Sequence, residues 1–329
     1  WVAGLTRWAV RRVAGIFIAG EDVQRARPAL QALTASGRAA TLDQLGELVV
    51  TADEADHYRD AVLALIDGAA ALHTGARNSA DLPLAHVSVK VSALSAHYDA
   101  IDVEGTWRRV GPRLRMVLRR AMELGVFINL DAEHESVRDL TLEMLRRALR
   151  SDDALWQHRD VGIVVQAYLR DAPAHLAAVV ELARERAVCM PIRLVKGAYW
   201  DAETTEADAH RYEAPQWLNK VETDLCFSAL TLVALREGAF VQLAVGSHNI
   251  HDHCFARAAR TLRFPDAPAI EHQCLHATYE ALSMAMAGAG WPVRNYIPVG
   301  SMLMGMAYLV RRVMENSSQV GVLTMARGD

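Results

Sequence analysis

Residues 307–315 carry the clearest candidate for an anion-binding face. Their sequence, AYLVRRVME, places two adjacent guanidinium groups near a tyrosine in an otherwise apolar segment. On a helix of about 3.6 residues per turn, four polar side chains share one face: Tyr308, Arg311, Arg312 and Glu315. Paired arginines present parallel N–H donors to a carboxylate, so we expect a carboxylate clamp. A solvated basic face with an Arg–Glu pair is the commoner source of such a pattern, but the apolar remainder of the segment argues against it.

A second group of reactive side chains is the cluster of His248, His251, His253 and Cys254. Residues 251–253 form an HxH, a spacing typical of metal-dependent hydrolases built on barrels. In those enzymes the HxH follows the first strand, whereas here it follows the sixth predicted strand. The alternative interpretation is that His248 serves a cofactor while His251 and His253 lie in the first turns of the next helix.

The elements that must position these residues alternate along the chain. Short β-branched segments predict eight strands, at residues 40–45, 87–91, 127–131, 162–168, 192–196, 241–245, 270–273 and 295–299. Between them lie helical patterns such as residues 140–150 and 172–186, whose apolar side chains form one stripe. This alternation predicts a (β/α)8 TIM barrel. A doubly wound open sheet competes, but it would normally bring a GxGxxG or Walker loop, and the sequence has neither.

The predicted strand ends are unusually polar. One charged residue at a strand end is usually solvated, but a barrel brings its C-terminal strand ends to one rim, where active sites form. The rim residues would be Lys90, Asp131, Gln166, Arg193, Lys196, His248, Asn249, Gln273 and Tyr296. Lysine, arginine, amide and imidazole groups suit an anionic, hydrogen-bonding ligand better than a divalent metal.

Composition excludes several other functions. With 35 Lys and Arg against 39 Asp and Glu, the net charge is −4, so the basic field that nucleic acid requires is missing. The four cysteines form no CxxC pair, which favours free, buried thiols in a reducing compartment. No apolar run is long enough to span a bilayer. We expect one domain over residues 1–329, with a helical arm at 1–38 and the barrel at 39–329. The chain begins with Trp1 rather than Met, so a longer parent protein is one expectation.

Seven strings along the chain resemble those of one family. They are SVKVSAL (88–94), INLDAE (128–133), VVQAY (164–168), IRLVKGAYWD (192–201), SHN (247–249), YIPVG (296–300) and AYLVRRVMEN (307–316). Together they resemble the proline dehydrogenase domain, especially that of the bifunctional bacterial proline utilisation A (PutA) enzymes. The resemblance implies a distorted (β/α)8 barrel with the last helix over its mouth. It also implies FAD as cofactor and oxidation of L-proline to Δ1-pyrroline-5-carboxylate, with hydride transfer to flavin N5 and electrons passed to a quinone.

The resemblance also implies roles for residues around the substrate. Lys90, Arg311 and Arg312 would hold the substrate carboxylate, and Leu275, Tyr296 and Tyr308 would enclose the ring. Glu47 would pair with Arg311 and close the site, although by itself it could be an ordinary carboxylate at a helix N-terminus. The implied catalytic set is Lys90, Asp131, Arg193, Tyr296, Tyr308, Arg311 and Arg312.

Other residues would bind the cofactor. Arg193 would lie near flavin N5, and Gln166 would contact the pyrimidine edge. The ribityl, pyrophosphate and adenine portions would contact residues 195–200 with His248 and Asn249. The full implied set is Asp131, Gln166, Arg193, Val195, Lys196, Gly197, Ala198, Tyr199, Trp200, Ser247, His248, Asn249, Gln273 and Glu315.

Two loops depart from the family pattern. Ala277, Thr278 and Tyr279 stand where the family usually has GMG, and residues 301–303 replace a usual Thr-His-Glu. These changes leave open a third alternative, a flavin-binding domain without catalytic activity. The implied partners are L-proline, a quinone, and a fused or separate pyrroline-5-carboxylate (glutamate semialdehyde) dehydrogenase. We expect a cytoplasmic protein with at most peripheral contact at the inner face of the membrane.

Overall fold

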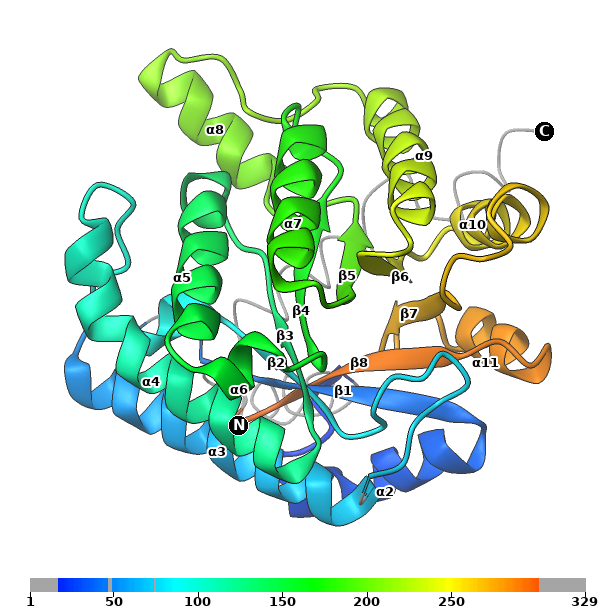
Figure 1. Cartoon of the computed structure of the whole chain (residues 1–329), viewed down its shortest axis with the longest axis horizontal. Coiled ribbons are helices and arrows are strands. Elements are labelled where there is room, and N and C mark those ends of the chain that lie inside the picture. Colours follow the sequence, from blue (N-terminus) through cyan, green and yellow to red (C-terminus); the bar gives the residue numbers. More distant parts are fainter. Residues whose placement is uncertain (1–16, 47–48, 74, 302–329) are drawn as a thin grey trace, which may run out of the picture.

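Eight parallel strands form a closed barrel in the computed structural model, which describes residues 17–46, 49–73 and 75–301 (Figure 1). Each strand pairs with the next, and β8 closes the barrel on β1. The strands are β1 (Arg38–Gln44), β2 (His86–Val89), β3 (Phe127–Leu130), β4 (Val161–Gln166), β5 (Met190–Val195), β6 (Val241–Gly246), β7 (Glu271–Leu275) and β8 (Val293–Val299). The predicted (β/α)8 fold is therefore confirmed.

Helices surround the barrel and cover its outer face (Figure 1). Those of the described residues are α2 (Val23–Ala35), α3 (Ala52–His73), α4 (Val103–Leu124), α5 (Arg138–Arg150), α6 (Asp153–Trp156), α7 (Ala172–Arg186), α8 (Trp200–His210), α9 (Lys220–Arg236), α10 (Ile250–Arg263) and α11 (Glu280–Gly288), with short 3-10 turns η1 (Val91–Leu94) and η2 (Glu135–Val137). On α4 the buried stripe includes Val110, Leu114 and Leu118, which follow the spacing of one helical face. All six residues of β4, VGIVVQ, are buried, as expected for a strand covered on both sides.

The boundaries of the predicted strands shift by a few residues. Val91, expected at the end of the second strand, instead begins η1, because the chain turns there and the Ala93 N–H donates to the Lys90 carbonyl at 3.2 Å. Within the described part of the predicted helical arm, only Val23–Ala35 is a full helix. Gly20 instead forms a parallel bridge with Val299 at the end of β8. The predicted helix over the barrel mouth lies outside the described residues.

The junction between β1 and β8 is the longest strand pairing. It runs in register from Arg38 opposite Val293 to Gln44 opposite Val299. Beyond the strands, the Leu45 N–H donates to the Val299 carbonyl at 2.9 Å. The first and last strands are therefore joined along their whole length.

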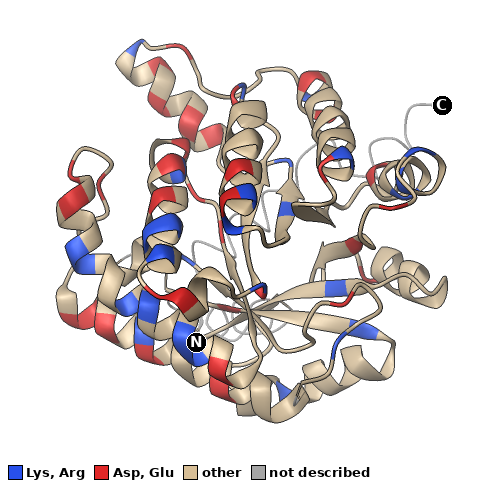
Figure 2. Cartoon of the chain, viewed as in Figure 1, with Lys and Arg blue, Asp and Glu red and all other residues tan. Residues whose placement is uncertain are grey.

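The outer surface carries charges of both signs. Figure 2 shows Lys and Arg interspersed with Asp and Glu along the outer helices. Among the described residues, no helix combines the length and apolar composition that crossing a membrane requires. The four cysteines are free, but the expectation that they are buried is wrong for Cys254, which is exposed, and only Cys274 is buried.

Candidate active site

The C-terminal end of β2 brings Lys90 to a buried carboxylate. Its ammonium Nζ lies 2.5 Å from Oδ1 of Asp43 on β1, and both side chains are almost fully buried. The backbone N–H of Lys90 donates to Oη of Tyr58 on α3 at 3.0 Å. Burial raises the pKa of Asp43 to about 6, although Lys90 acts in the opposite direction. Lys90 therefore lies where it was predicted, next to an acid that the sequence analysis missed.

Arg193 on β5 lies at the centre of a second polar cluster. Its Nη1 donates to Oδ1 of Asp131 at 2.8 Å, and its Nε donates to Oε1 of Gln273 at 2.6 Å. Its Nη2 donates to Oγ of Ser88 at 3.2 Å. The Tyr296 hydroxyl donates to the other oxygen of Asp131 at 2.7 Å, and the Tyr296 ring centroid lies 5.3 Å from the guanidinium carbon. Four residues predicted from the sequence, three on β5, β7 and β8 and one directly after β3, thus form one connected group.

The Tyr296 hydroxyl is held in its protonated form. Burial raises the pKa of Tyr296 well above its usual value, and the neighbouring Asp131 and Asp43 add to this effect. A neutral phenol can donate to Asp131, which fixes that carboxylate between a hydroxyl and a guanidinium. The cluster therefore provides an orienting network rather than a tyrosinate base.

Gln166 at the end of β4 has an unsatisfied acceptor. Its Nε2 donates to the Glu133 carbonyl at 3.2 Å. Its Oε1 is buried and has no hydrogen-bond partner among the residues that the structure describes. Buried amide oxygens are normally paired, so this atom can accept a donor from a ligand.

The loop after β5 contains the predicted cofactor residues 195–200. Gly197 has φ of 144°, and a Cβ on it would lie 2.0 Å from Cδ1 of Tyr168, so only glycine fits there. Lys196 lies between two acids missed from the sequence, with Nζ 2.6 Å from Asp224 and 2.9 Å from Asp252. Trp200 is 40% exposed, and its Nε1 donates to the Trp217 carbonyl. The loop offers exposed groups at Gly197, Ala198 and Trp200, but the charge of Lys196 is already balanced by neighbouring acids.

His248 lies at the end of β6 beside the altered loop. The Leu275 N–H donates to its Nε2 at 3.0 Å, so a neutral His248 carries its proton on Nδ1. The Tyr279 ring lies 4.2 Å from the imidazole, and Ala277 has φ of 58° where the family usually has glycine. Tyr279, one of the residues that depart from the family pattern, therefore packs directly on a predicted cofactor residue.

Ser247 and Asn249 organise the start of α10. Asn249 caps the helix by accepting from the His251 N–H at 3.0 Å. The Ser247 hydroxyl donates to Asp252 at 2.6 Å and accepts from the Asn249 N–H at 3.0 Å. Both residues have a structural use in addition to any ligand contact.

The histidines of the alternative metal site do not converge. His251 and His253 lie in the first turn of α10, as the second interpretation predicted. Nδ1 of His253 lies 3.0 Å from Nδ1 of His272, and Nε2 of His253 lies 2.8 Å from the Ser247 carbonyl oxygen. His248 instead accepts from the backbone N–H of Leu275. Within the described ranges, no group of three or more His, Cys, Asp or Glu side chains is arranged to hold a metal ion. The geometry thus gives no support to the metal-dependent hydrolase.

Five predicted residues lie outside the part of the chain that the structure describes: Glu47, Tyr308, Arg311, Arg312 and Glu315. Their roles remain predictions. The described residues alone define a parallel (β/α)8 barrel with buried and paired cations in the C-terminal half of its strands, the side on which active sites of this fold form.

Comparison with known proteins identifies the family. The model of the family described as proline dehydrogenase matches residues 26–325, so this chain belongs to the proline dehydrogenase family. It is 29% identical over 321 residues to the bifunctional protein PutA of Escherichia coli (strain K12), covering 94% of this chain and 24% of that protein. It is also 29% identical to the proline dehydrogenase of Deinococcus radiodurans, covering 95% of this chain and 89% of that protein.

Solved structures give the same result. The crystal structure of proline utilization A from Bdellovibrio bacteriovorus, inactivated by N-propargylglycine, superposes with a TM-score of 0.93 at 34% identity. The match covers all of this chain and 35% of that one. This chain therefore spans about a quarter to a third of the PutA proteins that it matches.

Proposed function

We propose that this chain is an FAD-dependent proline dehydrogenase, which oxidises L-proline to Δ1-pyrroline-5-carboxylate and passes the electrons to a quinone. The observation that carries the proposal is the Arg193–Asp131–Tyr296 cluster, at the rim of a barrel that belongs to this family. The Deinococcus radiodurans relative, named a proline dehydrogenase, is matched over most of its length.

The residues at the barrel mouth suit a flavin. The unpaired Oε1 of Gln166 is an acceptor of the kind that the N3–H of a flavin pyrimidine edge requires. Arg193 is a fixed cation, and a cation beside flavin N1 or N5 raises its electron affinity. Bound FAD would supply a two-electron acceptor at N5 for the hydride from C5 of proline.

The protein's own residues have the tasks of binding and orientation. Lys90 would bind the substrate carboxylate, together with Arg311 and Arg312, while Tyr296 and Leu275 would contact the ring. Tyr308 and Glu47, which are not among the described residues, would close the pocket. No strong base is needed when the secondary amine arrives deprotonated, so positioning and charge contribute most of the catalysis.

The partners follow from the same assignment. PutA relatives are named bifunctional and are about four times as long as this chain. We propose that a pyrroline-5-carboxylate dehydrogenase, in the same or a separate polypeptide, consumes the product, and that a quinone reaches the enzyme at the inner face of the membrane.

The proposal is tested by purifying the protein and recording its visible spectrum. We expect a yellow protein that releases FAD on denaturation and reduces a quinone or dye when L-proline is added. Protein that stays colourless after incubation with FAD would contradict the cofactor assignment. Bound FAD without proline oxidation would favour the inactive flavin-binding domain. A Lys90→Met variant is the matched control, since it should keep FAD and lose affinity for proline.

A further inference from the structure

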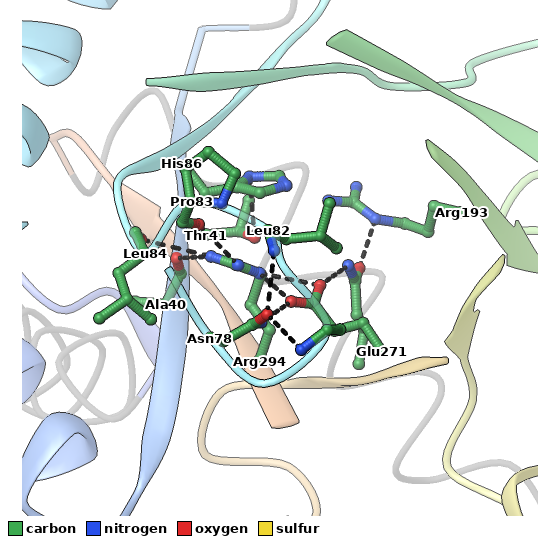
Figure 3. A network of polar contacts seen from close by, with 12 residues as sticks. Ala40, Thr41, Asn78, Leu82, Pro83, Leu84, His86, Arg193, Glu271 and Arg294 are labelled. Carbon is green, nitrogen blue, oxygen red and sulfur yellow. Dashed lines mark hydrogen bonds and ion pairs between the residues drawn. The ribbon is translucent and has the colours of Figure 1, made fainter. Parts of the chain in front are cut away.

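A further buried ion pair lies deeper in the barrel, below the rim. Glu271 at the start of β7 and Arg294 on β8 are both completely inaccessible to solvent. Figure 3 shows this pair among the backbone of β1 and the loop before β2, with Arg193 at the upper side of the network. The proposed chemistry uses neither residue, so their burial calls for a separate explanation.

The Glu271 carboxylate accepts hydrogen bonds from two residues on one side. Nε of Arg294 lies 2.9 and 3.0 Å from the two carboxylate oxygens, and Nδ2 of Asn78 donates to Oε2 at 2.5 Å. Arg294 is itself held by the carbonyls of Ala40 at 2.8 Å and Pro83 at 2.9 Å. Arg294 and Asn78 both donate to the carboxylate, so Glu271 acts as an acceptor, and the ion pair with Arg294 holds it in place.

On its other side, the Glu271 carboxylate sets the orientation of the Gln273 side-chain amide. Nε2 of Gln273 donates to Oε1 of Glu271 at 2.7 Å. Glu271 and Gln273 are two residues apart on β7, so their side chains point to the same side of the strand. A carboxylate accepts but cannot donate, so the NH2 group of Gln273 must face Glu271 and its carbonyl oxygen must point away.

That carbonyl oxygen is the atom that Arg193 contacts, at 2.6 Å from Nε. A flipped amide would direct N–H groups at the guanidinium and an oxygen at the carboxylate, and both contacts would be repulsive. The remaining guanidinium nitrogens donate hydrogen bonds to Asp131 and Ser88, so three acceptors from separate segments of the chain set the plane of Arg193. Of these three contacts, the Gln273 contact is the one that connects Arg193 to Glu271.

We propose that Glu271 is a positioning residue for Arg193, acting through the orientation of the Gln273 amide. The inference rests on the proposed function, in which Arg193 lies beside the flavin. The buried ion pair then does more than stabilise the barrel, because its negative end determines which group Arg193 meets.

Two substitutions in the holoprotein test this role. Glu271→Asp keeps the charge beside Arg294 but withdraws the oxygen from Gln273, and Glu271→Gln removes the charge that orients the amide. For both variants we expect the rate of flavin reduction by proline to fall about tenfold, the factor for losing one hydrogen bond to a charged group. The affinity for a carboxylate inhibitor should change less than about twofold, because the substrate side of the pocket is not altered.

Asn78→Ala is the matched control, since it removes a neighbour of Glu271 that does not touch Gln273. It should lower the melting temperature and leave flavin reduction within about twofold of the parent. Combining Glu271→Asp with Arg193→Met should slow flavin reduction no further than Arg193→Met alone. Glu271 acts through Arg193, so its substitution has no further effect once that guanidinium is absent.

Distinct results separate this inference from the proposed function. If Arg193→Met reduces its flavin as fast as the parent, the placement of Arg193 beside the flavin is wrong. If a crystal structure of Glu271→Asp shows Arg193 and Gln273 unmoved, the positioning role is overturned whatever the flavin does. If Asn78→Ala and Glu271→Asp slow flavin reduction equally, the role of Glu271 is only structural. Should Glu271→Gln fail to fold, Glu271→Asp alone decides between these outcomes.

Discussion

The carboxyl group of Asp43 leads to a prediction about how carboxylate ligands bind as the pH changes. Burial raises its pKa to about 6, with Asp131 acting in the same direction and Lys90 and Tyr296 opposing it. On the proposed assignment, the substrate carboxylate binds the same ammonium that Asp43 contacts at 2.5 Å. A second negative charge then lies beside Asp43 and raises the pKa of its carboxyl further. Ligand binding should therefore take up a proton above about pH 6.

The size of this effect can be worked out from the geometry. Two carboxylate oxygens that accept hydrogen bonds from the same ammonium nitrogen lie about 4.5 Å apart. With an effective dielectric constant of about 20, two charges at that distance repel by roughly 3.7 kcal/mol, equivalent to about two to three pKa units. The pKa of Asp43 would reach about 8 or more in the complex. The dissociation constant should then rise up to about tenfold per pH unit between about pH 6 and 8.

The assay is inhibitor titration followed by the absorbance of the bound flavin. Tetrahydrofuran-2-carboxylate is a suitable ligand, since it has no amine that titrates. In Asp43→Asn the amide still contacts Lys90 but cannot ionise, so the dissociation constant should not vary with pH. A parent protein whose affinity changes less than about twofold from pH 6 to 8 would refute the reasoning, as would the same slope in Asp43→Asn.

Gly197→Ala should lose both FAD and thermal stability, because the added Cβ would meet the Tyr168 ring at 2.0 Å; an equally stable yellow variant would disprove the close approach. His272→Gln should reduce the loss of stability in acid. Burial lowers the pKa of His272 from 6.5 to about 3, so its contribution is present above pH 6.5 and is lost as the pH falls toward 3, by at most about 5 kcal/mol. Denaturant unfolding at pH 7 and pH 4 measures this, and parallel losses in parent and variant would count against it. Arg312→Met should weaken the carboxylate inhibitor by about 2 to 4 kcal/mol, and Arg311→Met by less. Equal shifts below about 1 kcal/mol in flavin-monitored titrations would indicate a solvated face instead.

The fold was predictable because its signals are local. The helix expected over residues 172–186 matches α7 (Ala172–Arg186), where Pro173 suits the first turn and the apolar residues form one stripe. Strands such as β4 are recognised by β-branched residues that are buried throughout. The boundaries moved where a turn is fixed by a backbone hydrogen bond, as at Lys90, which side-chain patterns do not reveal.

The polar cluster around Arg193 was predictable in its members but not in its pairings. Arg193, Asp131, Gln273 and Tyr296 were all found because they are polar residues within or directly after predicted strands, and the structure brings them together. Asp43 also lies near the end of a predicted strand, so the same rule applied to the first strand would have found it.

The ion pairs could not be predicted, because they depend on which side chains meet across the barrel. Asp43 and Lys90 are 47 residues apart, and Asp224 and Lys196 are 28 apart. Sequence spacing at these separations carries no information about distance. The sequence therefore predicted cations at the rim that bind an anionic ligand, but not the acids that already pair with Lys90 and Lys196.

The seam between β1 and β8 has a consequence for how the protein is made. The two strands are joined along their whole length, yet about 250 residues separate the end of one from the end of the other. At about 5 to 20 residues per second, the ribosome needs roughly 13 to 50 seconds to cover that interval. During this time the first strand has a row of backbone donors and acceptors on the side that β8 will later occupy, and such an edge invites pairing with other chains. A nascent chain that has not reached Val293 is therefore a natural substrate for chaperones, and the most vulnerable segment of its barrel is β1.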